Sequence, residues 1–420
     1  ADSEKKNVQA EGVSENGEMS EELQKKLKEL DKESNTAEYK GICAKVIAVI
    51  CICFSLFQIY TGFFGALDAM IQRCVHLSFG ICLVYLLCPT KKAWVKEGRF
   101  HPIDVALAVL AMIPPIYILV NYQQLILRAG TVTPTDTVIG VLGIVMIIEA
   151  ARRSSLLSAA SLRMGSSDRT SPGRSHIGAT IKQMVGHLFF TTEGVFGIPM
   201  GVSSTFIFLF ILFGAYLEKT GLGKFFIDIA NAIAGWASGG PAKVAVISSA
   251  LQGTISGSSV ANVVGSGSFT IPMMKKTGYP PEFAGAVEAA SSTGGQIMPP
   301  IMGAAAFLMA EYMKLPYAQV AVKAILPALL YFTGIFIAVH LEAKKLGLKG
   351  VPREELPAWR LLVRDCYLII PLILLVWLVS SGSKTMSHSA AYSILAAIAV
   401  GFVNFFLQGK RGEGDTQPMT

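Results

Sequence analysis

Residues 251–300 place many helix-disfavouring residues in the middle of a strongly apolar chain. Gly, Ser, Thr, Asn and Pro crowd into Leu251–Pro272 and again into Ser291–Pro300. Inside a membrane, backbone that leaves the helix is tolerated only where protein covers it or where it lines a water-filled cavity. Broken helices of this kind form ion and substrate sites in secondary transporters, where freed carbonyls and half-helix ends coordinate the ligand. The feature therefore predicts an all-α membrane protein that transports a solute rather than catalysing a reaction.

The composition supports a polytopic protein that contacts the lipid bilayer. The 420 residues are 52% hydrophobic and 15% charged, with a mean hydropathy of +0.51, whereas soluble domains carry about 25% charged residues. The net charge of +7 does not indicate nucleic-acid binding, because the basic residues concentrate beside apolar runs, as the positive-inside rule expects. The seven cysteines lie mostly in two apolar runs, where a thiol acts as a small hydrophobe, so no disulfide framework is expected.

The first part of the chain predicts a charged tail and a four-helix membrane unit. Residues 1–40 have no apolar core, so they are expected to be a cytoplasmic tail and not a signal peptide. Residues 41–153 contain four runs close to the length of about 20 apolar residues that crosses a membrane. The placement of Lys and Arg predicts that both ends of this unit face the cytoplasm. The four runs are Ile42–Phe64, Ala69–Cys88, Ile103–Asn121 and Thr135–Ala150.

The later part of the chain predicts a re-entrant hairpin and a broken helix. Two half-length segments, Pro241–Ile255 and Val260–Met274, flank the polar turn Ser256–Ser259, and basic residues stand at both outer ends. This arrangement predicts a hairpin entered from the cytoplasm. Phe283–Met313 is too long for one straight span and is interrupted at Thr293–Pro300. The other predicted elements are an interfacial arm Leu188–Gly201, a span around Ser203–Leu217, a surface helix Gly223–Trp236, and spans Tyr317–Leu341, Tyr367–Ser380 and Ala390–Leu407.

Residues 154–181 raise a problem of topology. The four-helix unit should end inside, whereas the span around Ser203–Leu217 should start outside because Lys219 follows it. Some segment must therefore cross the membrane between them, but residues 154–181 are too polar to face lipid. Either Leu188–Gly201 crosses poorly or an expected helix is absent. We favour the absent helix and interpret residues 154–181 as a polar linker.

Several motifs in a fixed order resemble the permease of tripartite ATP-independent periplasmic (TRAP) transporters. The similarity is to the branch in which the small and large membrane subunits are fused and in which TAXI-type binding proteins serve the permease. It covers Lys182–Leu407 strongly and Ile42–Ala151 weakly, as a small-subunit-like unit. The motifs are TEGVFGIP at Thr192–Pro199, SGSSVAN at Ser256–Asn262, GSFTIP at Gly267–Pro272 and GGQIMPP at Gly294–Pro300.

The resemblance implies a multi-pass carrier of the bacterial inner membrane with a cytoplasmic N-terminus. It implies sodium as the coupling ion with no other cofactor, and a periplasmic solute-binding protein that delivers a small organic anion such as a carboxylate. The implied fold is the first half of an inverted-repeat elevator, residues 182–407, after the four-helix unit. The chain departs from the family pattern because only one repeat precedes the polar tail 408–420. It is therefore expected to be a truncated or shortened permease.

The resemblance places sodium and part of the substrate between the hairpin tip and the broken helix opposite. Hydroxyls, an Asn amide and unwound carbonyls supply oxygen to a hard cation without adding fixed charge. Glu288, five residues before Thr293, is the candidate coupling residue, although a structural hydrogen-bonding role fits it equally well. The carried-over residues are Ser256, Gly257, Ser258, Ser259 and Asn262 on the hairpin, and Thr293, Gly294 and Gly295 on the broken helix.

Four alternatives remain open at this point. The Ser and Gly residues could serve only close helix packing. An intramembrane serine protease would use Ser256 in its glycine-rich turn, but no histidine lies between His187 and His340. A passive channel would also use broken helices, although the paired hairpin and interrupted helix suit gated carriage better. The last alternative is a truncated, non-transporting remnant or a scaffold membrane protein.

Overall fold

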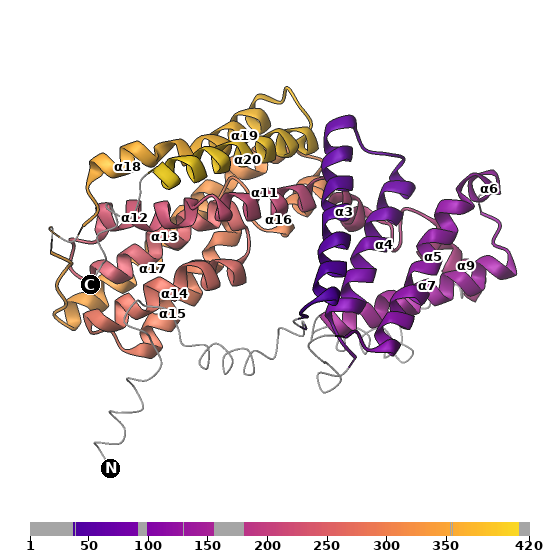
Figure 1. Ribbon diagram of the computed structural model, residues 1–420, viewed down its shortest axis with the longest axis horizontal. Coiled ribbons are helices and arrows are strands. Elements are labelled where there is room, and N and C mark those ends of the chain that lie inside the picture. The colour runs from indigo at the N-terminus through magenta and orange to yellow at the C-terminus, as the bar shows by residue number, and fades with distance from the viewer. Residues whose placement is uncertain are drawn as a thin grey trace, which may run out of the picture. The chain divides into compact units, whose positions relative to one another are not determined.

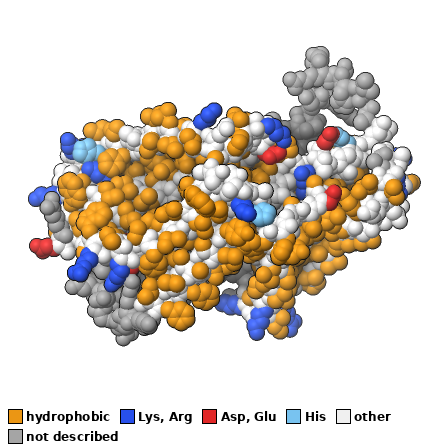
Figure 2. Space-filling view, turned by 90° about the horizontal axis from the view of Figure 1, so that it is seen from above, with side chains coloured by type: hydrophobic (Ala, Val, Ile, Leu, Met, Phe, Trp, Pro, Cys, Tyr) orange, Lys and Arg blue, Asp and Glu red, His pale blue; other side chains and the backbone are white. Residues whose placement is uncertain are grey.

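The computed structural model is helical, and its described residues form two compact units, one ending at Thr205 and the other beginning at Phe206 (Figure 1). Among these residues, eight helices are long and apolar enough to cross a membrane, which confirms the predicted all-α polytopic class. Hydrophobic side chains cover most of the face shown in Figure 2. The structure describes residues 37, 39–90, 99–128, 130–154, 180–352, 354 and 356–410.

The first unit contains four membrane-length helices close to the predicted runs. The N-terminus of the second is capped by the Asp68 carboxylate, which accepts a hydrogen bond from the Met70 N–H at 3.0 Å. Pro102 occupies the first turn of the third, where its missing N–H costs no helical hydrogen bond. The helices are α3 (Ile42–Phe64), α4 (Ala69–Leu87), α5 (Pro102–Val120) and α7 (Pro134–Ser154), with the short α6 (Tyr122–Leu127) between the last two.

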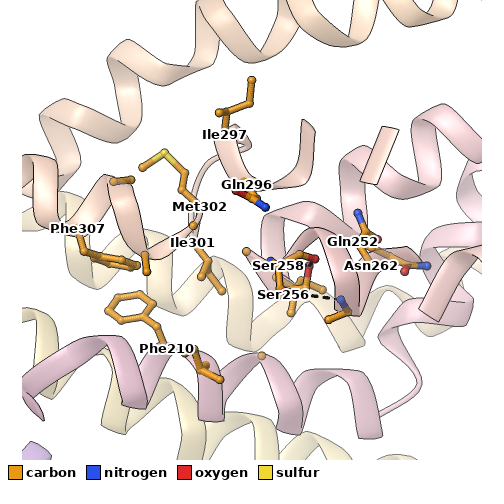
Figure 3. Close-up of a pocket in the computed structure, with 18 of the residues that line it drawn as sticks. Phe210, Gln252, Ser256, Ser258, Asn262, Gln296, Ile297, Ile301, Met302 and Phe307 are labelled. Carbon is orange, nitrogen blue, oxygen red and sulfur yellow. Dashed lines mark hydrogen bonds between the residues drawn. The ribbon is translucent and has the colours of Figure 1, made fainter. Parts of the chain in front are cut away.

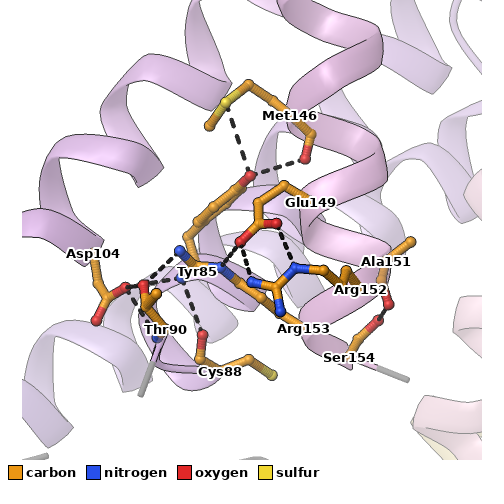
Figure 4. Close-up of polar contacts among 10 residues, drawn as sticks. All are labelled: Tyr85, Cys88, Thr90, Asp104, Met146, Glu149, Ala151, Arg152, Arg153 and Ser154. Carbon is orange, nitrogen blue, oxygen red and sulfur yellow. Dashed lines mark hydrogen bonds and ion pairs between the residues drawn. The ribbon is translucent and has the colours of Figure 1, made fainter. Parts of the chain in front are cut away.

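Arg153, in the last turn of α7, is the centre of a buried network (Figure 4). Its side chain is 1% exposed, and its Nη1 lies 2.8 Å from Oδ1 of Asp104 on α5. The guanidinium also donates to Glu149 and to the Thr90 hydroxyl, and it lies 4.5 Å from the ring centroid of Tyr85 on α4. This network joins α4, α5 and α7 at one end of the unit.

The predicted interfacial arm is packed within the first unit. Helix α9 (Ile181–Phe190) starts with a capping box formed by Thr180 and Gln183, and it packs against α7. The rings of Phe189 and Phe196 are completely buried in a cluster with side chains of α4 and α5. The arm therefore packs on protein through these aromatic residues, and its place at the membrane interface stays a prediction.

The span predicted around Ser203–Leu217 begins earlier than expected. Helix α10 (Ile198–Val202), the π-helix η2 (Ser203–Ile207) and α11 (Phe208–Lys219) make one continuous span of 22 residues. Pro199 lies in its first turn, where proline is compatible with a helix. Helix α9 has 10 residues and is therefore about 15 Å long, too short to cross. Residues 155–179 lie outside the described residues, so the absent crossing helix stays a prediction.

The second unit contains the predicted hairpin and broken helix. Helix α12 (Leu222–Ala234) packs its buried apolar face against α13, and its place along the membrane surface stays a prediction. Alanine and other apolar side chains of α13, α15 and α17 form the main core. The elements are the hairpin α13 (Gly240–Ser256) and α14 (Ser259–Thr277), the broken helix α15 (Pro281–Gly294), η3 (Gly295–Ile297) and α16 (Ala304–Met313), and then α17 (Tyr317–Lys345), α18 (Trp359–Asp365), η5 (Cys366–Ile369), α19 (Ile370–Ser381) and α20 (Met386–Lys410).

Three predicted segments fall almost entirely outside the described residues. They are the charged tail 1–40, the polar linker 154–181 and the polar tail 408–420. Their roles stay predictions.

Candidate functional site

The hairpin tip is a two-residue reversal, Gly257 and Ser258, between α13 and α14. Gly257 has a φ of 56°, in the left-handed region that favours glycine, and a Cβ atom there would lie 2.2 Å from the carbonyl oxygen of Met302. Ser258 has an extended backbone, and its hydroxyl accepts a hydrogen bond from the N–H of Ala261 at 3.4 Å, which caps α14. The local sequence thus ends one helix and starts the next while bringing the turn against residues after α15.

The break in the opposite helix lies directly against this tip. Helix α15 ends at Gly294, and helical structure resumes only at Ala304 after the short η3 and an irregular stretch. The main chains of Gly253 and Gly295 touch, since a Cβ on Gly253 would come within 2.3 Å of the Gly295 Cα. The Gln296 amide also donates to the Ser259 hydroxyl at 2.9 Å. The tip and the break, which the sequence predicts to face each other, are in contact.

Asn262, in the first turns of α14, has a buried oxygen without a partner. The residue is 1% exposed, and its Nδ2 donates to the Ser249 carbonyl of α13 at 2.9 Å. This bond orients the amide, because only the nitrogen can donate to a carbonyl. Its Oδ1 has no hydrogen-bond partner among the described residues. A buried, unsatisfied acceptor costs free energy, so this oxygen is suited to a cation or a water molecule.

Glu288 lies on α15 inside a ring of hydroxyl groups. It is fully buried, and no ion pair joins it to a basic residue within the described part of the chain. Hydroxyls from the hairpin and from α15 itself reach its two carboxyl oxygens: Ser249, Ser266, Thr270 and Ser292. Two of them, Ser266 and Thr270, can alternatively donate to carbonyls of their own helix at 2.8 and 3.1 Å. Because each hydroxyl has one proton, the ring can accommodate either a charged or a protonated carboxyl group.

The candidate binding residues inferred from the family resemblance do not all lie where the tip meets the break. Ser256, Gly257 and Ser258 line a cavity with Asn262, and Ser259 is held by Gln296 beside it. Gly295 touches the hairpin, since a Cβ there would lie 3.1 Å from the Asn262 Nδ2. Two residues lie elsewhere. Thr293 is exposed and donates to its own helix at 2.7 Å, and a Cβ on Gly294 would meet the ring of Tyr331 on α17.

Sequence reasoning missed several residues of this region. Gly253 contacts the main chain of the break at Gly295, and Gln296 donates a hydrogen bond to the tip. Asn262, Ser266 and Thr270 follow one another at intervals of four, which places them on one face of α14. That spacing was a signal that could have identified the hydroxyls facing Glu288.

The tip and the break open into one wide cavity of the second unit. Its volume is about 1630 Å³, larger than the pockets of about 300–1,000 Å³ that hold most small ligands. Figure 3 shows Ser256 and Ser258 between the aromatic pair Phe210 and Phe307 on one side and Asn262 on the other. The cavity therefore combines an apolar wall with a wall of hydroxyl and amide groups. Among the described residues, no group of His, Cys, Asp and Glu could hold a transition metal.

The comparisons with known proteins agree with this architecture. The family described as "Tripartite ATP-independent periplasmic transporter, DctM component" matches residues 137–415. A C4-dicarboxylate TRAP transporter large permease protein, DctM of Pseudomonas aeruginosa, is 28% identical over 199 residues, which are 47% of this chain and 45% of that protein. The sialic acid TRAP transporter large permease protein SiaM of Vibrio cholerae is 24% identical over 195 residues, or 46% and 45% of the two chains. The isethionate TRAP transporter permease protein DctMQ of Oleidesulfovibrio alaskensis is 27% identical over 195 residues, or 46% and 30%.

These matches settle the class of protein but not its whole activity. Each of these relatives is a transporter permease, so the protease alternative is set aside. The chain spans at most 45% of the length of these three relatives.

Proposed function

The chain belongs to the DctM component family of tripartite ATP-independent periplasmic transporters, and on this premise we propose that it forms part of a sodium-driven carrier for a small organic anion. It is a multi-pass membrane protein and a permease component rather than an enzyme. The proposal adds the coupling ion, the class of solute, a periplasmic binding protein that delivers it, and a place in the bacterial inner membrane with the N-terminus in the cytoplasm. A fused small subunit and a TAXI-type partner belong to the same proposal.

The buried, unpartnered oxygen of Asn262 is the observation that carries the sodium proposal. It lies where the hairpin tip meets the break, so irregular main-chain carbonyls and hydroxyls are close by. Oxygen ligands of this kind are those that hard cations prefer. A site built from neutral oxygens can also release its ion again, as a transport cycle requires. Ser256, Ser258 and the main chain around Gly257 and Gly295 are the proposed additional ligands.

The solute proposal rests on the cavity and on the relatives. C4-dicarboxylate, sialic acid and isethionate, the solutes in the relatives' names, all carry an acidic group. The cavity of this chain has room for such a molecule and offers hydroxyl and amide donors beside an apolar wall. Those donors suit the oxygen atoms of an organic acid, and the apolar wall suits its carbon skeleton.

Uptake into liposomes tests the proposed function directly. The purified chain is reconstituted with its periplasmic binding protein, and accumulation of succinate, isethionate and sialic acid is measured with and without an inward sodium gradient. Accumulation of one acid only with sodium and the binding protein is expected. Equal uptake with and without the sodium gradient would reject sodium as the coupling ion. Absence of uptake by a protein that still binds sodium would favour the non-transporting scaffold or remnant.

Glu288 is proposed as a coupling residue because its hydroxyl ring accepts either protonation state. In the same liposomes, Glu288→Gln keeps the size of the side chain and most of its hydrogen bonds but cannot exchange a proton. A coupling role predicts that the variant folds normally and that the dependence of uptake on the ion gradients changes. Unchanged gradient dependence would assign Glu288 to structure alone.

Asn262→Ala is expected to weaken sodium binding by about tenfold or more, which is ~1.4 kcal/mol or more of binding free energy. The substitution removes the amide oxygen, for which the described part of the chain offers no hydrogen-bond partner. Calorimetric titration of the detergent-solubilised chain with sodium chloride measures the change. Thr293→Ala is the matched control, because its hydroxyl faces its own helix and not the tip. Equal sodium affinities for wild type and Asn262→Ala would remove this residue from the site.

A further inference from the structure

Helix α17 presents one charged side chain to the cavity. The face of α17 that lines the cavity consists of Val320, Lys323, Ala324 and Pro327, which recur at intervals of three and four. Val322 and Leu326, which alternate with them in the sequence, do not line the cavity and are 67% and 65% exposed. Lys323 is the charged member of this face, and the rest of the face is apolar.

Lys323 differs from two nearby lysines, because no described acidic residue pairs with it. Lys314, just before α17, pairs with Glu311 at 2.8 Å, and Lys345, at its other end, pairs with Glu342 at 3.2 Å. Within the described part of the chain, no hydrogen bond or ion pair joins Lys323 to another residue. Lys323 is exposed rather than buried, and an ionisable group in a membrane span that lines a cavity is a functional candidate.

The other charged residues of the cavity lie on different elements. Glu218 is in the last turn of α11. Lys224 and Asp228 are one turn apart on α12, where their opposite charges attract each other. The positive-inside rule places Lys219 and Lys224 on the same membrane side as the Lys344–Lys345 end of α17. The cavity therefore has Lys323 on α17 and its acidic residues on α11 and α12.

We propose that Lys323 binds the acid group of the solute in this cavity. This inference rests on the proposed function, because it assigns a recognition residue to the same organic anion. A lysine ammonium is a compact charge with three donors, so it can pair with a carboxylate or a sulfonate alike. The apolar part of the cavity lining, which includes Phe307 and Pro327, strengthens the pair, because it reduces the competition from water.

Equilibrium binding to the full purified chain in lipid nanodiscs tests this inference. Radiolabelled succinate, isethionate and N-acetylneuraminate are the probes, and each is titrated with and without sodium. Lys323→Gln is expected to raise the Kd of the bound acid at least tenfold. Lys323→Arg keeps the charge, so its Kd should stay within about threefold of the wild-type value. Lys314→Gln is the matched control, because this exposed lysine does not line the cavity.

The outcomes separate this inference from the proposed function. If the wild-type chain binds one of the acids and Lys323→Gln binds it equally well, Lys323 does not recognise the acid group, while the anion carrier stands. If the wild-type chain binds none of the acids, both the anionic solute and the role of Lys323 are rejected. Thermal unfolding of the variants confirms that a loss of affinity does not arise from misfolding.

Discussion

Replacing Arg153 with methionine is expected to lower the free energy of unfolding of the four-helix unit by about 3–5 kcal/mol, the cost of breaking a buried ion pair. The substitution keeps most of the side-chain volume and removes the charge. Asp104 then remains buried without the guanidinium beside it, and among the described residues its Oδ2 has no hydrogen-bond partner even in the native protein. The Thr90 hydroxyl and the ring of Tyr85 also lose their contacts with the guanidinium. Unfolding of the purified chain in mixed detergent micelles measures the change.

Arg152 supplies the control for this experiment. It neighbours Arg153 and pairs with Glu149 at 2.6 Å, but its side chain is 50% exposed. Exposed pairs contribute about 0–1 kcal/mol, so Arg152→Met should change stability little. The double variant Arg153→Met, Asp104→Asn should recover part of the loss, because no buried charge is left unpaired. Equal stabilities of the two single methionine variants would show that burial does not distinguish the two arginines.

The break and the hairpin could be predicted because their residue composition differs from that of the apolar helices around them. Gly, Ser and Pro are conspicuous in an apolar chain, and each disfavours a continuous helix for its own physical reason. The helix α15 accordingly ends at Gly294, and the tip reverses at Gly257. Element type and approximate bounds follow from such local chemistry, without knowledge of the packing.

Which side chains of α15 face the hairpin depends on how this helix is rotated about its axis, and the residue pattern of the sequence did not specify that rotation. Thr293 and Gly295 are two residues apart, and only Gly295 faces the hairpin. Glu288 stood out because it is ionisable, but its partners come from α13, α14 and its own helix α15, and the first two are distant in sequence. Arg153 resembled an ordinary basic residue at the inner end of a span, yet it is buried. The orientation of each side chain, its partners and its burial are set by how the helices pack, and this packing depends on the sequence of the whole unit.

Gly253→Ala is expected to separate the hairpin from the broken helix and to weaken sodium binding and stability together. The added Cβ would lie 2.3 Å from the Cα of Gly295, closer than any van der Waals contact allows, and neither main chain can rotate away as a side chain could. Overpacking of this kind costs about 1–3 kcal/mol or more. Because Gly295 also abuts the amide of Asn262, the displacement should move oxygens out of the proposed ion site. Sodium titration and detergent unfolding measure the two effects.

Gly285→Ala is the control that shows whether the effect of Gly253→Ala comes from the contact between Gly253 and Gly295. Gly285 lies within α15, and a Cβ there meets nothing within 4 Å. Alanine should therefore stabilise this helix by up to about 1 kcal/mol through its better helix propensity, with sodium affinity unchanged. The contrast between two identical substitutions tests whether the ion site needs the main chains of Gly253 and Gly295 in contact. If Gly253→Ala bound sodium as tightly as Gly285→Ala, the site could not lie between the hairpin tip and the break.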